Sequence, residues 1–272
     1  MTIYPLLPRT NCGKCPQKVC MGFAVQLCER NVALEDCPPL FEEKYEEDLG
    51  RLRELLAPPV REVVIGMGNH QVKIGGELVL RRHELRYFNP TAIAVVVDDG
   101  MPEDTLLKQV KETSEFAYNY IGMTLRLDMV AIRSTLKDPV KFENTVRKVS
   151  EATDMPLILS SFDPHILERG LLAVQERRPL LYAATKDNWK DMAELAFKYN
   201  CPLAVYSPND IKTLRSIVSA LKAWEVEDIA LDVGSEFGER ISNTINNLTM
   251  LRTSAIIEED EFSSFPLIAS FP

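Results

Sequence analysis

The sequence predicts an α/β fold with a largely parallel sheet, and three observations support this prediction. The chain has 272 residues, of which 46% are hydrophobic and 26% are charged, so it is long enough for one large α/β domain and a small additional one. From residue 91 onward, short apolar runs alternate with longer amphipathic segments. The apolar runs do not alternate with polar residues, which is typical of strands that are buried on both faces of a parallel sheet.

A small helical domain is predicted over residues 1–57. Residues 21–30 have apolar side chains at helical spacing, and a second, amphipathic helix is expected from Pro38 onward. The proline pair that begins at Pro58 ends this helix, because proline lacks an amide donor and disfavours helical backbone at the preceding residue. We therefore assign residues 58–272 to a second domain.

The second domain is predicted to begin with one or two β-hairpins over residues 61–88, where β-branched residues alternate and glycines mark the turns. Asp163-Pro164 and Pro208-Asn209 are expected to start helices. Buried strands are expected at 91–99, 126–134, 156–161, 179–185, 202–207, 228–234 and 266–272. Amphipathic helices are expected at 101–121, 138–153, 163–176, 186–200, 208–225 and 236–257.

Repeated βα units without a glycine-rich nucleotide-binding turn favour a TIM-barrel-like domain over an open sheet. The sequence contains seven candidate strands, six of them secure, whereas a closed barrel needs eight. The predicted barrel is therefore incomplete, and three explanations stay open. The hairpin region contributes a strand, a partner closes the gap, or the chain is a shortened form of a longer protein.

Charge and hydropathy exclude several classes of partner. The net charge is -9 and the pI is about 5.1, so the overall field does not attract nucleic acid. No apolar run approaches the roughly 18 residues that cross a bilayer. The N-terminus lacks a charged segment followed by a long apolar one, so we expect no signal peptide, no membrane association and a cytoplasmic location.

Five of the six cysteines fall within 26 residues near the start of the chain. Four of them have the spacing Cys12-x2-Cys15-x4-Cys20-x16-Cys37, and a proline follows the last. On a long chain without a secretion signal, such clustering favours metal or Fe–S ligation over disulfides. Thiolates are soft, anionic ligands that suit the iron of a cubane cluster, so the spacing favours a [4Fe–4S] site.

A zinc site made of the same four cysteines is the alternative. Zinc sites usually pair two Cys-x2-Cys knuckles, whereas Cys37 stands alone. Cys28, on the apolar face of the first helix, and Cys201, just before a strand, are expected to be buried thiols without a ligand role.

Several segments resemble the large subunit of the corrinoid iron–sulfur protein, which is the gamma subunit of the archaeal acetyl-CoA decarbonylase/synthase complex. The resemblance extends over nearly the whole chain, and it is most specific in the cysteine segment and around GGELVLRRHE. The matching segments are LPRTNCGKCPQKVCMGFAVQL, DCPPL, VVIGMGNHQVKIGGELVLRRHE, FNPTAIAVVVDD, RPLLYAAT, N-x3-M-A-x-L-A-x3-N-CPLAV and LDVG.

The resemblance implies a [4Fe–4S] cluster on Cys12, Cys15, Cys20 and Cys37, followed by a TIM barrel. In this family the cluster passes electrons that return the Co(II) of a methyl-carrying corrinoid to Co(I). The chain contains no Asp-x-His-x-x-Gly cobalt-ligand motif, so the corrinoid is expected on a partner or on a missing C-terminal domain. Expected partners are the small subunit of the corrinoid iron–sulfur protein, a methyltransferase and CO dehydrogenase/acetyl-CoA synthase.

Carboxylates near the predicted strands are weaker candidates. Asp98 and Asp99 end the first buried strand, Asp128 lies in the second, and Asp232 lies in the sixth. Carboxylates at strand ends face the usual active-site rim of a barrel, but capping of the following helix is the favoured interpretation for Asp99. His83 follows a predicted strand, and a surface salt-bridge cluster with its charged neighbours is the favoured interpretation there.

Three functions follow from these observations. The first is an Fe–S component of a corrinoid methyl-transfer system in the reductive acetyl-CoA pathway, in which turnover belongs to the assembly. The second is a stand-alone Fe–S barrel that acts as a methyltransferase or as an activator of a corrinoid protein. The third is a zinc-bearing scaffold without redox chemistry.

Overall fold

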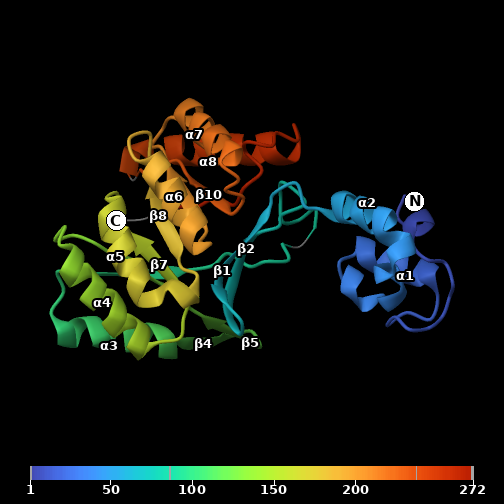
Figure 1. The fold of residues 1–272 in the computed structure, drawn as a ribbon, viewed down its shortest axis with the longest axis horizontal. Coiled ribbons are helices and arrows are strands. Elements are labelled where there is room, and N and C mark those ends of the chain that lie inside the picture. Colours follow the sequence, from blue (N-terminus) through green and yellow to red (C-terminus); the bar gives the residue numbers. More distant parts are fainter. Residues whose placement is uncertain (1, 86, 237, 271–272) are drawn as a thin grey trace. The chain divides into compact units, whose positions relative to one another are not determined.

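A computed structural model describes residues 2–85, 87–236 and 238–270 of the chain. Two compact units divide the structure after Pro58, and Figure 1 shows the helical first unit and the α/β second unit. Within the described residues, no helix is both long enough and apolar enough to cross a membrane.

Unit 1 consists of two α-helices joined by short 3-10 turns. Leu49 and Leu52 of α2 pack with Phe23 and Leu27 of α1 in one small apolar cluster. The predicted helix at Pro38 begins instead with 3-10 turns, and regular helix starts eight residues later. The elements are η1 (Tyr4–Leu6), α1 (Cys20–Cys28), η2 (Leu34–Asp36), η3 (Pro38–Phe41), η4 (Glu43–Tyr45) and α2 (Glu46–Leu56).

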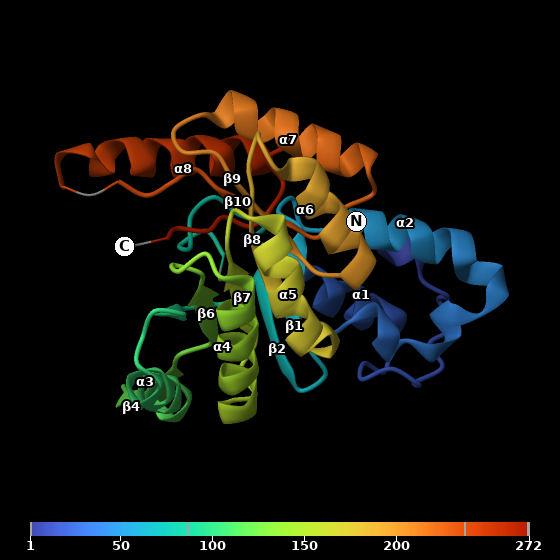
Figure 2. The ribbon, with the colours of Figure 1, turned by 60° about the vertical axis from the view of Figure 1, so that its left-hand side comes forward.

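Unit 2 contains a six-stranded parallel sheet in the order β10-β9-β8-β7-β6-β3, so consecutive strands of the chain are neighbours. This confirms an α/β fold with a parallel sheet, and Figure 2 shows α4, α5 and α6 against one face of it. The strands are β3 (Ala94–Asp98), β6 (Met129–Arg133), β7 (Leu157–Ser160), β8 (Leu180–Ala184), β9 (Leu203–Tyr206) and β10 (Ile229–Asp232). The helices are α3 (Glu103–Glu115), α4 (Pro139–Ala152), α5 (Pro164–Val174), α6 (Trp189–Tyr199), α7 (Ile211–Ala223) and α8 (Ile241–Ile256), with η5 (Gln175–Arg177) and η6 (Gly238–Arg240).

Two apolar clusters lie on opposite faces of this sheet. The larger cluster joins the helices to one face and includes the fully buried Phe142 and Leu159. The smaller cluster includes Met129, Leu180 and Ile65. Its members alternate along the strands with those of the larger cluster, as side chains on opposite faces of a sheet do.

One hairpin, of β1 (Glu62–Met67) and β2 (His70–Gly75), covers the second face of the sheet. Gly66 and Gly75 have φ values of +91° and +82°, and a Cβ there would lie 2.2 Å and 2.1 Å from a backbone oxygen. Only glycine fits such positions. Within the described residues of 61–88, one hairpin forms rather than two, and it does not join the parallel sheet.

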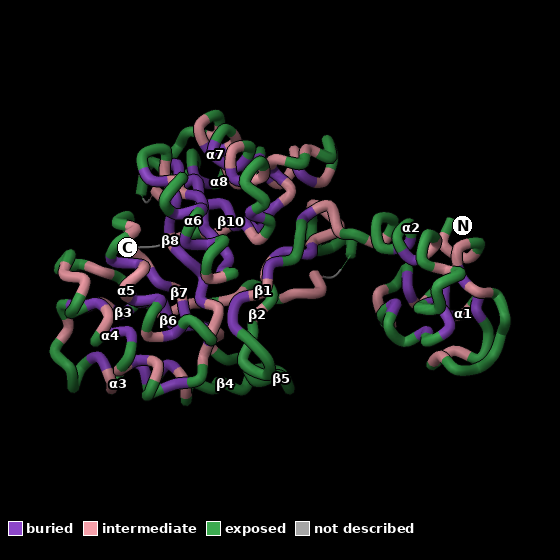
Figure 3. The backbone as a smooth tube through the Cα atoms, in the orientation of Figure 1, coloured by how far each residue is buried: buried purple, intermediate pink, exposed green. Residues whose placement is uncertain are grey.

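The predicted helix over residues 101–121 is wrong in its second half. Helix α3 ends at Glu115, and the chain then forms an antiparallel hairpin of β4 (Ala117–Tyr120) and β5 (Met123–Arg126). Ile121 and Gly122 form its turn with φ values of +47° and +78°. Positive φ at both central residues matches the right-handed twist of a two-residue hairpin, and this turn outweighs the helical spacing of the apolar residues. Figure 3 shows β4 and β5 as exposed.

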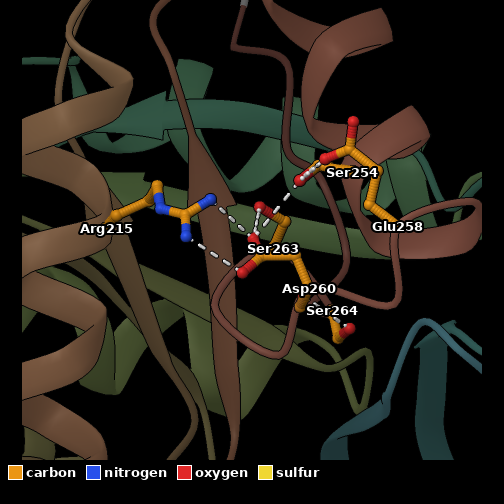
Figure 4. Close-up of polar contacts among 6 residues, drawn as sticks. All are labelled: Arg215, Ser254, Glu258, Asp260, Ser263 and Ser264. Atoms are coloured by element: carbon orange, nitrogen blue, oxygen red, sulfur yellow. Dashed lines mark hydrogen bonds and ion pairs between the residues drawn. The ribbon is translucent and has the colours of Figure 1, made fainter.

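The predicted strand at 266–272 is only partly described. Leu267 forms an isolated parallel bridge with Leu231 of β10, and residues 271–272 lie outside the described residues. Figure 4 shows the polar network that precedes this segment, in which Arg215 of α7 holds both carboxylate oxygens of Asp260 at 2.8 and 3.0 Å. Ser263 also donates to Asp260, at 2.6 Å. The network fastens the segment beside β10.

Both predicted helix starts are capped by an aspartate side chain, but α7 begins later than predicted. The side chain of Asp163 accepts a hydrogen bond from the His165 amide at 2.9 Å and caps α5, which confirms the predicted start. Helix α7 begins later than Pro208 predicts, because Asp210 accepts from the Thr213 amide at 3.0 Å and forms the cap.

Candidate functional site

The loop before α1 carries the first two cysteines of the candidate site. Asn11 and Gly13, which flank Cys12, have φ values of +49° and +69°, so the backbone turns twice within three residues. The side chain of Asn11 accepts a hydrogen bond from the Cys20 amide at 2.9 Å. This contact ties the start of the loop to the first residue of α1, and it brings Cys12 toward Cys20.

Cys20 and Cys37 lie deeper in the unit than the loop cysteines. Cys20 begins α1, and Cys37 lies between η2 and η3, where its amide donates to Leu34 and its carbonyl accepts from Leu40. Both thiols are buried within the apolar cluster of unit 1, whereas Cys15 is half-buried and Cys12 is exposed. The site therefore has an apolar inner side and an open outer side.

The pKa of the Cys15 thiol is affected by all three of the other candidate ligands. Burial, a hydrogen bond with Cys37 and the negative charges of Cys37, Cys12 and Cys20 raise the pKa of Cys15 to about 12. At Cys12 the effect has the opposite sign, because a hydrogen bond from the Lys14 backbone and one from the Thr10 hydroxyl lower the pKa of that thiol. Four thiolates at this place repel one another unless a positively charged core compensates them.

This donor set fits a cluster of iron and sulfide. The four sulfur atoms come from a short loop, from a helix start and from a second turn, and all six cysteines of the chain are free thiols. A cubane core is polynuclear and accepts soft thiolates on several of its corners. Among the described residues, no three His, Cys, Asp or Glu side chains are placed to hold a single metal ion. The four cysteines are linked through Cys15, which shares a hydrogen bond with Cys37 and interacts electrostatically with Cys12 and Cys20.

The two remaining cysteines behave differently from each other. Cys28 is exposed, so the prediction of a buried thiol is wrong, because in the last turn of α1 it is Leu27 that packs in the cluster, and Cys28 lies on the outer side of the helix. Cys201 is buried, as predicted, and burial raises the pKa of its thiol to about 12.

Asp99 does not cap the following helix, which corrects the sequence interpretation. Helix α3 has Pro102 at its cap position and no side-chain hydrogen bond there. The Asp99 carboxylate accepts from the amides of Thr135 and Leu136 at 2.7 and 3.0 Å, and from the hydroxyls of Thr135 and Ser134 at 2.8 and 3.1 Å. Burial opposes its ionisation, but these hydrogen bonds outweigh burial and lower the pKa of Asp99. It holds together the loops that follow β3 and β6.

Asp232 forms a buried polar cluster at the carboxyl end of β10. It accepts hydrogen bonds from the Gly234 amide at 2.7 Å, from the Tyr182 hydroxyl at 2.9 Å and from the Ser270 hydroxyl at 3.1 Å. Its side chain is fully buried, and burial raises the pKa of Asp232. Sequence reasoning missed Tyr182 and Ser270, because they lie 50 and 38 positions from Asp232 in the chain and no local pattern links them to it.

A cavity of about 520 Å³ lies along the hairpin-covered face of the sheet. Tyr182 and Ser270 line it near Asp232, and Arg133 and Ser160 line it at the ends of β6 and β7. Its other walls include the edge strand β3 and the segment 266–270, which pairs with β10. The cavity therefore lies between the edge strand β3 and the segment 266–270 beside β10.

The other charged candidates lie elsewhere. Asp128 precedes β6, so it is at the amino end of the sheet, where it accepts from the Ile93 amide at 2.8 Å. Asp98 accepts from the Gly100 amide at 2.9 Å in the loop after β3. His83 lies in an exposed turn that no strand precedes directly, and Glu84 there accepts from the Arg81 amide at 3.2 Å.

Comparison with known proteins finds matching families for segments of both units. The family described as CO dehydrogenase/acetyl-CoA synthase delta subunit matches residues 62–271, and a second family, whose description proposes an Fe–S cluster, matches residues 7–39. The gamma 2 subunit of the acetyl-CoA decarbonylase/synthase complex of Methanosarcina mazei is 42% identical over 98% of this chain. Gamma subunits from Methanothermobacter thermautotrophicus and Methanopyrus kandleri are 38% and 40% identical, over 98% and 100% of this chain. The chain spans 57% of the length of the first of these relatives and 57% and 58% of the other two.

Proposed function

The chain belongs to the CO dehydrogenase/acetyl-CoA synthase delta subunit family, and we propose that it is the Fe–S component of a corrinoid methyl-transfer system in the acetyl-CoA pathway. The observation that carries this proposal is that Cys15, Cys20 and Cys37 lie in one apolar cluster of unit 1, within a segment that matches a family whose description proposes an Fe–S cluster. Gamma subunits of acetyl-CoA decarbonylase/synthase complexes at about 40% identity support it.

In this proposal the thiolates of Cys12, Cys15, Cys20 and Cys37 hold a [4Fe–4S] cluster. The cluster, when bound, supplies one electron at a time for the return of cobalt to its nucleophilic state. The chain's own residues position and shield it. Asn11 fixes the ligand loop on α1, and Phe23 and Leu34 belong to the apolar cluster that excludes water from the inner side. The exposed Cys12 would be on the side of the site from which an electron could reach a partner.

The corrinoid and the catalytic partners belong to the wider assembly in this proposal. The corrinoid is held by a partner chain or by a further domain, and the small subunit, a methyltransferase and CO dehydrogenase/acetyl-CoA synthase bind to the complex. Unit 2 serves as the docking platform. We assign its sheet to a TIM barrel, because the six strands follow one another in chain order and Leu267 adds the start of a seventh.

The proposed barrel is incomplete between β3 and the segment 266–270. The cavity lies between the edge strand β3 and the segment 266–270, whose Leu267 pairs with β10, and this is where a closing strand would pair. Ile241 and Ile245 of α8 are exposed one helical turn apart, as expected for a helix that lacks one packing neighbour. These features support a barrel that is completed by additional polypeptide.

One observation favours a second candidate function. Tyr182 and Ser270, which both donate to the buried Asp232, line the cavity toward the carboxyl end of the sheet, and this is the usual place for chemistry in a barrel. A stand-alone methyltransferase or activator of a corrinoid protein would use such a mouth for its substrate. A zinc-bearing scaffold remains the third alternative for the cysteines.

Anaerobic purification with analysis of iron, sulfide, zinc and cobalt tests the proposal. We expect about four irons and four sulfides per chain, with a broad absorbance near 400 nm that dithionite bleaches. Zinc in place of iron contradicts the proposal and supports the scaffold. Methyl transfer by the isolated chain, without any partner, supports the second candidate function instead.

A further inference from the structure

A row of polar side chains lies at the carboxyl ends of three neighbouring strands of the parallel sheet. Arg133 of β6 is the register partner of Ser160 of β7, and Ser160 is the register partner of Tyr182 of β8. Register partners on neighbouring strands point to the same face of a sheet. All three residues line the cavity of about 520 Å³. We call Arg133, Ser160 and Tyr182 the polar row.

Below the polar row, the lining of the cavity is largely apolar. Ala131, Ile158 and Leu180, each two residues before a member of the row, form the next layer of the lining. Ile65 of the β1–β2 hairpin also lines the cavity. A cavity of this size, with apolar walls and a few polar groups, has the usual form of a small-molecule site. The polar row lies at the carboxyl ends of the strands, where barrels bind their ligands.

One charged side chain of the cavity lining lacks a charged partner among the residues that the structure describes. Glu77 and Arg252 form an ion pair with each other at 2.8 Å. Arg133 forms no ion pair within the described part of the chain, because the carboxylate of its register partner Asp98 accepts instead from the Gly100 amide at 2.9 Å. An unpaired guanidinium at a cavity mouth favours an anionic ligand group, and its planar fork matches a carboxylate.

The hydroxyl groups at the mouth differ in what they offer a ligand. The Tyr182 hydroxyl donates to Asp232 at 2.9 Å, and the Ser270 hydroxyl, which also lines the cavity, donates to the same carboxylate at 3.1 Å. Each hydroxyl has a single hydrogen, so these two oxygens act toward the cavity as acceptors. The Ser160 hydroxyl donates to no group among the described residues, and it can therefore donate to a ligand beside Arg133.

The spacing of the strands defines the length and shape of a fitting ligand. Neighbouring strands lie about 4.8 Å apart, so the backbones at Arg133 and Tyr182, with β7 between them, are separated by about 10 Å. Donors at one end and acceptors at the other suit a rigid molecule of similar length. The rings of Tyr182, Phe162 and Tyr206 lie with centroids 5.5 to 6.4 Å apart and form an aromatic rim, which favours a planar body.

We infer that the mouth of this cavity binds a planar organic acid that carries a hydrogen-bond donor at the end opposite its carboxylate. Arg133 and Ser160 hold the carboxylate, and the oxygens of Tyr182 and Ser270 accept from the donor. A strand that completed the barrel would pair beside β3, at the side of the cavity, whereas the polar row lies at its carboxyl end. The inference concerns unit 2 alone and does not depend on the cluster that is proposed for unit 1.

The test uses the full chain and probes that differ by one group each. para-Hydroxycinnamate is planar and carries a carboxylate and a hydroxyl at opposite ends, cinnamate lacks the hydroxyl, and para-hydroxycinnamide lacks the charge. Calorimetry at neutral pH measures each Kd. Arg133→Met removes the guanidinium and keeps an unbranched side chain. Arg126→Met is the matched control, because Arg126 of β5 is exposed and is not part of the cavity lining.

We expect para-hydroxycinnamate to bind to the wild type and Arg133→Met to weaken this binding roughly tenfold or more, because hydrogen bonds to a charged group are lost. The control should stay within about twofold. Cinnamate should bind to the wild type roughly two- to tenfold more weakly than para-hydroxycinnamate, which is the effect of one neutral hydrogen bond. Tyr182→Phe should reduce that preference, and Arg133→Met should leave the affinity for the amide unchanged.

Hydrogen exchange of residues 129–133 and 157–160 shows whether Arg133→Met keeps its sheet. Absence of binding of every probe to the folded wild type overturns the inference, as does equal binding of para-hydroxycinnamate by the wild type and Arg133→Met. Equal affinity of the wild type for the acid and its amide also overturns it, because the cavity then selects no charge. Iron and sulfide analysis tests the proposed function separately, so neither failure implies the other.

Discussion

The interior of unit 1 and the interior of unit 2 are stabilised by different means. Unit 1 has 58 residues, and its apolar cluster contains Cys20 and Cys37 among leucines and Phe23. Unit 2 has a long apolar seam between its sheet and its helices, where Phe142, Leu159 and Leu203 are fully buried. A domain as small as unit 1 buries a smaller share of its surface, so it depends on additional links.

This difference between the units indicates that the proposed cofactor of unit 1 also serves as a structural element. In unit 1 the proposed cluster joins the ligand loop, the start of α1 and the turn at Cys37, which are otherwise connected by few hydrogen bonds such as that of Asn11. In unit 2 the same task falls to apolar packing and to buried carboxylates such as Asp99. We therefore expect unit 1 to unfold when the cluster is lost and unit 2 to unfold when its apolar packing is disrupted, each independently of the other.

The largest expected effect is the loss of the cluster from unit 1. We expect Cys37→Ser to abolish most of the absorbance near 400 nm and to unfold much of unit 1, because the buried ligand on the turn is lost. Unit 2 should keep its hydrogen-exchange protection. Iron analysis and hydrogen exchange, read separately for residues 1–58 and 59–272, provide the measurement.

Cys28→Ser is the matched control for that experiment. Cys28 lies on the same helix as Cys20 but is exposed, so iron content and stability should stay unchanged. Loss of iron in the control would contradict the ligand assignment, as would a full complement of iron in Cys37→Ser.

The next effect concerns the core of unit 2. Phe142→Ala should lower the free energy of unfolding of unit 2 by about 3–5 kcal/mol, because it opens a cavity where the ring contacts α5 around Gly170. Urea unfolding monitored at Trp189 and Trp224 measures it, and the absorbance of the cluster should persist. Phe197→Ala, at a 68% exposed position, should change the stability far less. A simultaneous loss of both units in Phe142→Ala would show that the two are coupled.

Two aspartates of unit 2 should respond to pH with opposite signs. The pKa of Asp99 is lowered, so its stabilisation is present above its unfolded pKa and is lost as the pH falls through its folded pKa. The pKa of Asp232 is raised, so stability instead declines as the pH rises from its unfolded pKa through its folded pKa. Asp99→Asn should therefore cost about 1–3 kcal/mol near neutral pH, and the cost should shrink in acid.

Urea unfolding of the wild type and both variants between about pH 3 and 8 checks these signs. Asp232→Asn should remove the decline with rising pH, because the amide keeps an oxygen for Tyr182 and carries no charge to desolvate. Parallel pH curves for the two variants would refute the assignment of opposite roles.

The smallest expected effect is at the end of the sheet. Asp260→Asn should cost about 1 kcal/mol, because Arg215 loses its two-oxygen partner in a partly exposed pair. Faster hydrogen exchange at Ile268, whose amide donates to Leu231, would report the loosening of the segment beside β10. An unchanged exchange rate there would show that the bridge to β10 is independent of the network.

The sequence predicted the α/β fold and the parallel sheet, because apolar runs bounded by prolines and helix caps are local signals. Asp163, for example, caps α5 through its own neighbours and needs no distant partner. The segment after Glu115 was predicted as helix, because aromatic residues at 116, 118 and 120 fit either period until the turn at Ile121-Gly122 is known. The role of Asp99 was also missed, because its partners lie more than thirty residues further along the chain.

The amino-acid sequence by itself determined the four cysteines that are proposed as ligands, since their spacing and soft chemistry are properties of the chain. Tertiary structure alone decided how deep each thiol lies, that Cys28 points away, and that Asp232 finds Tyr182 and Ser270. The physical reason is range: spacing and capping act within a few residues, whereas burial and the pKa values it sets depend on segments that meet only after folding.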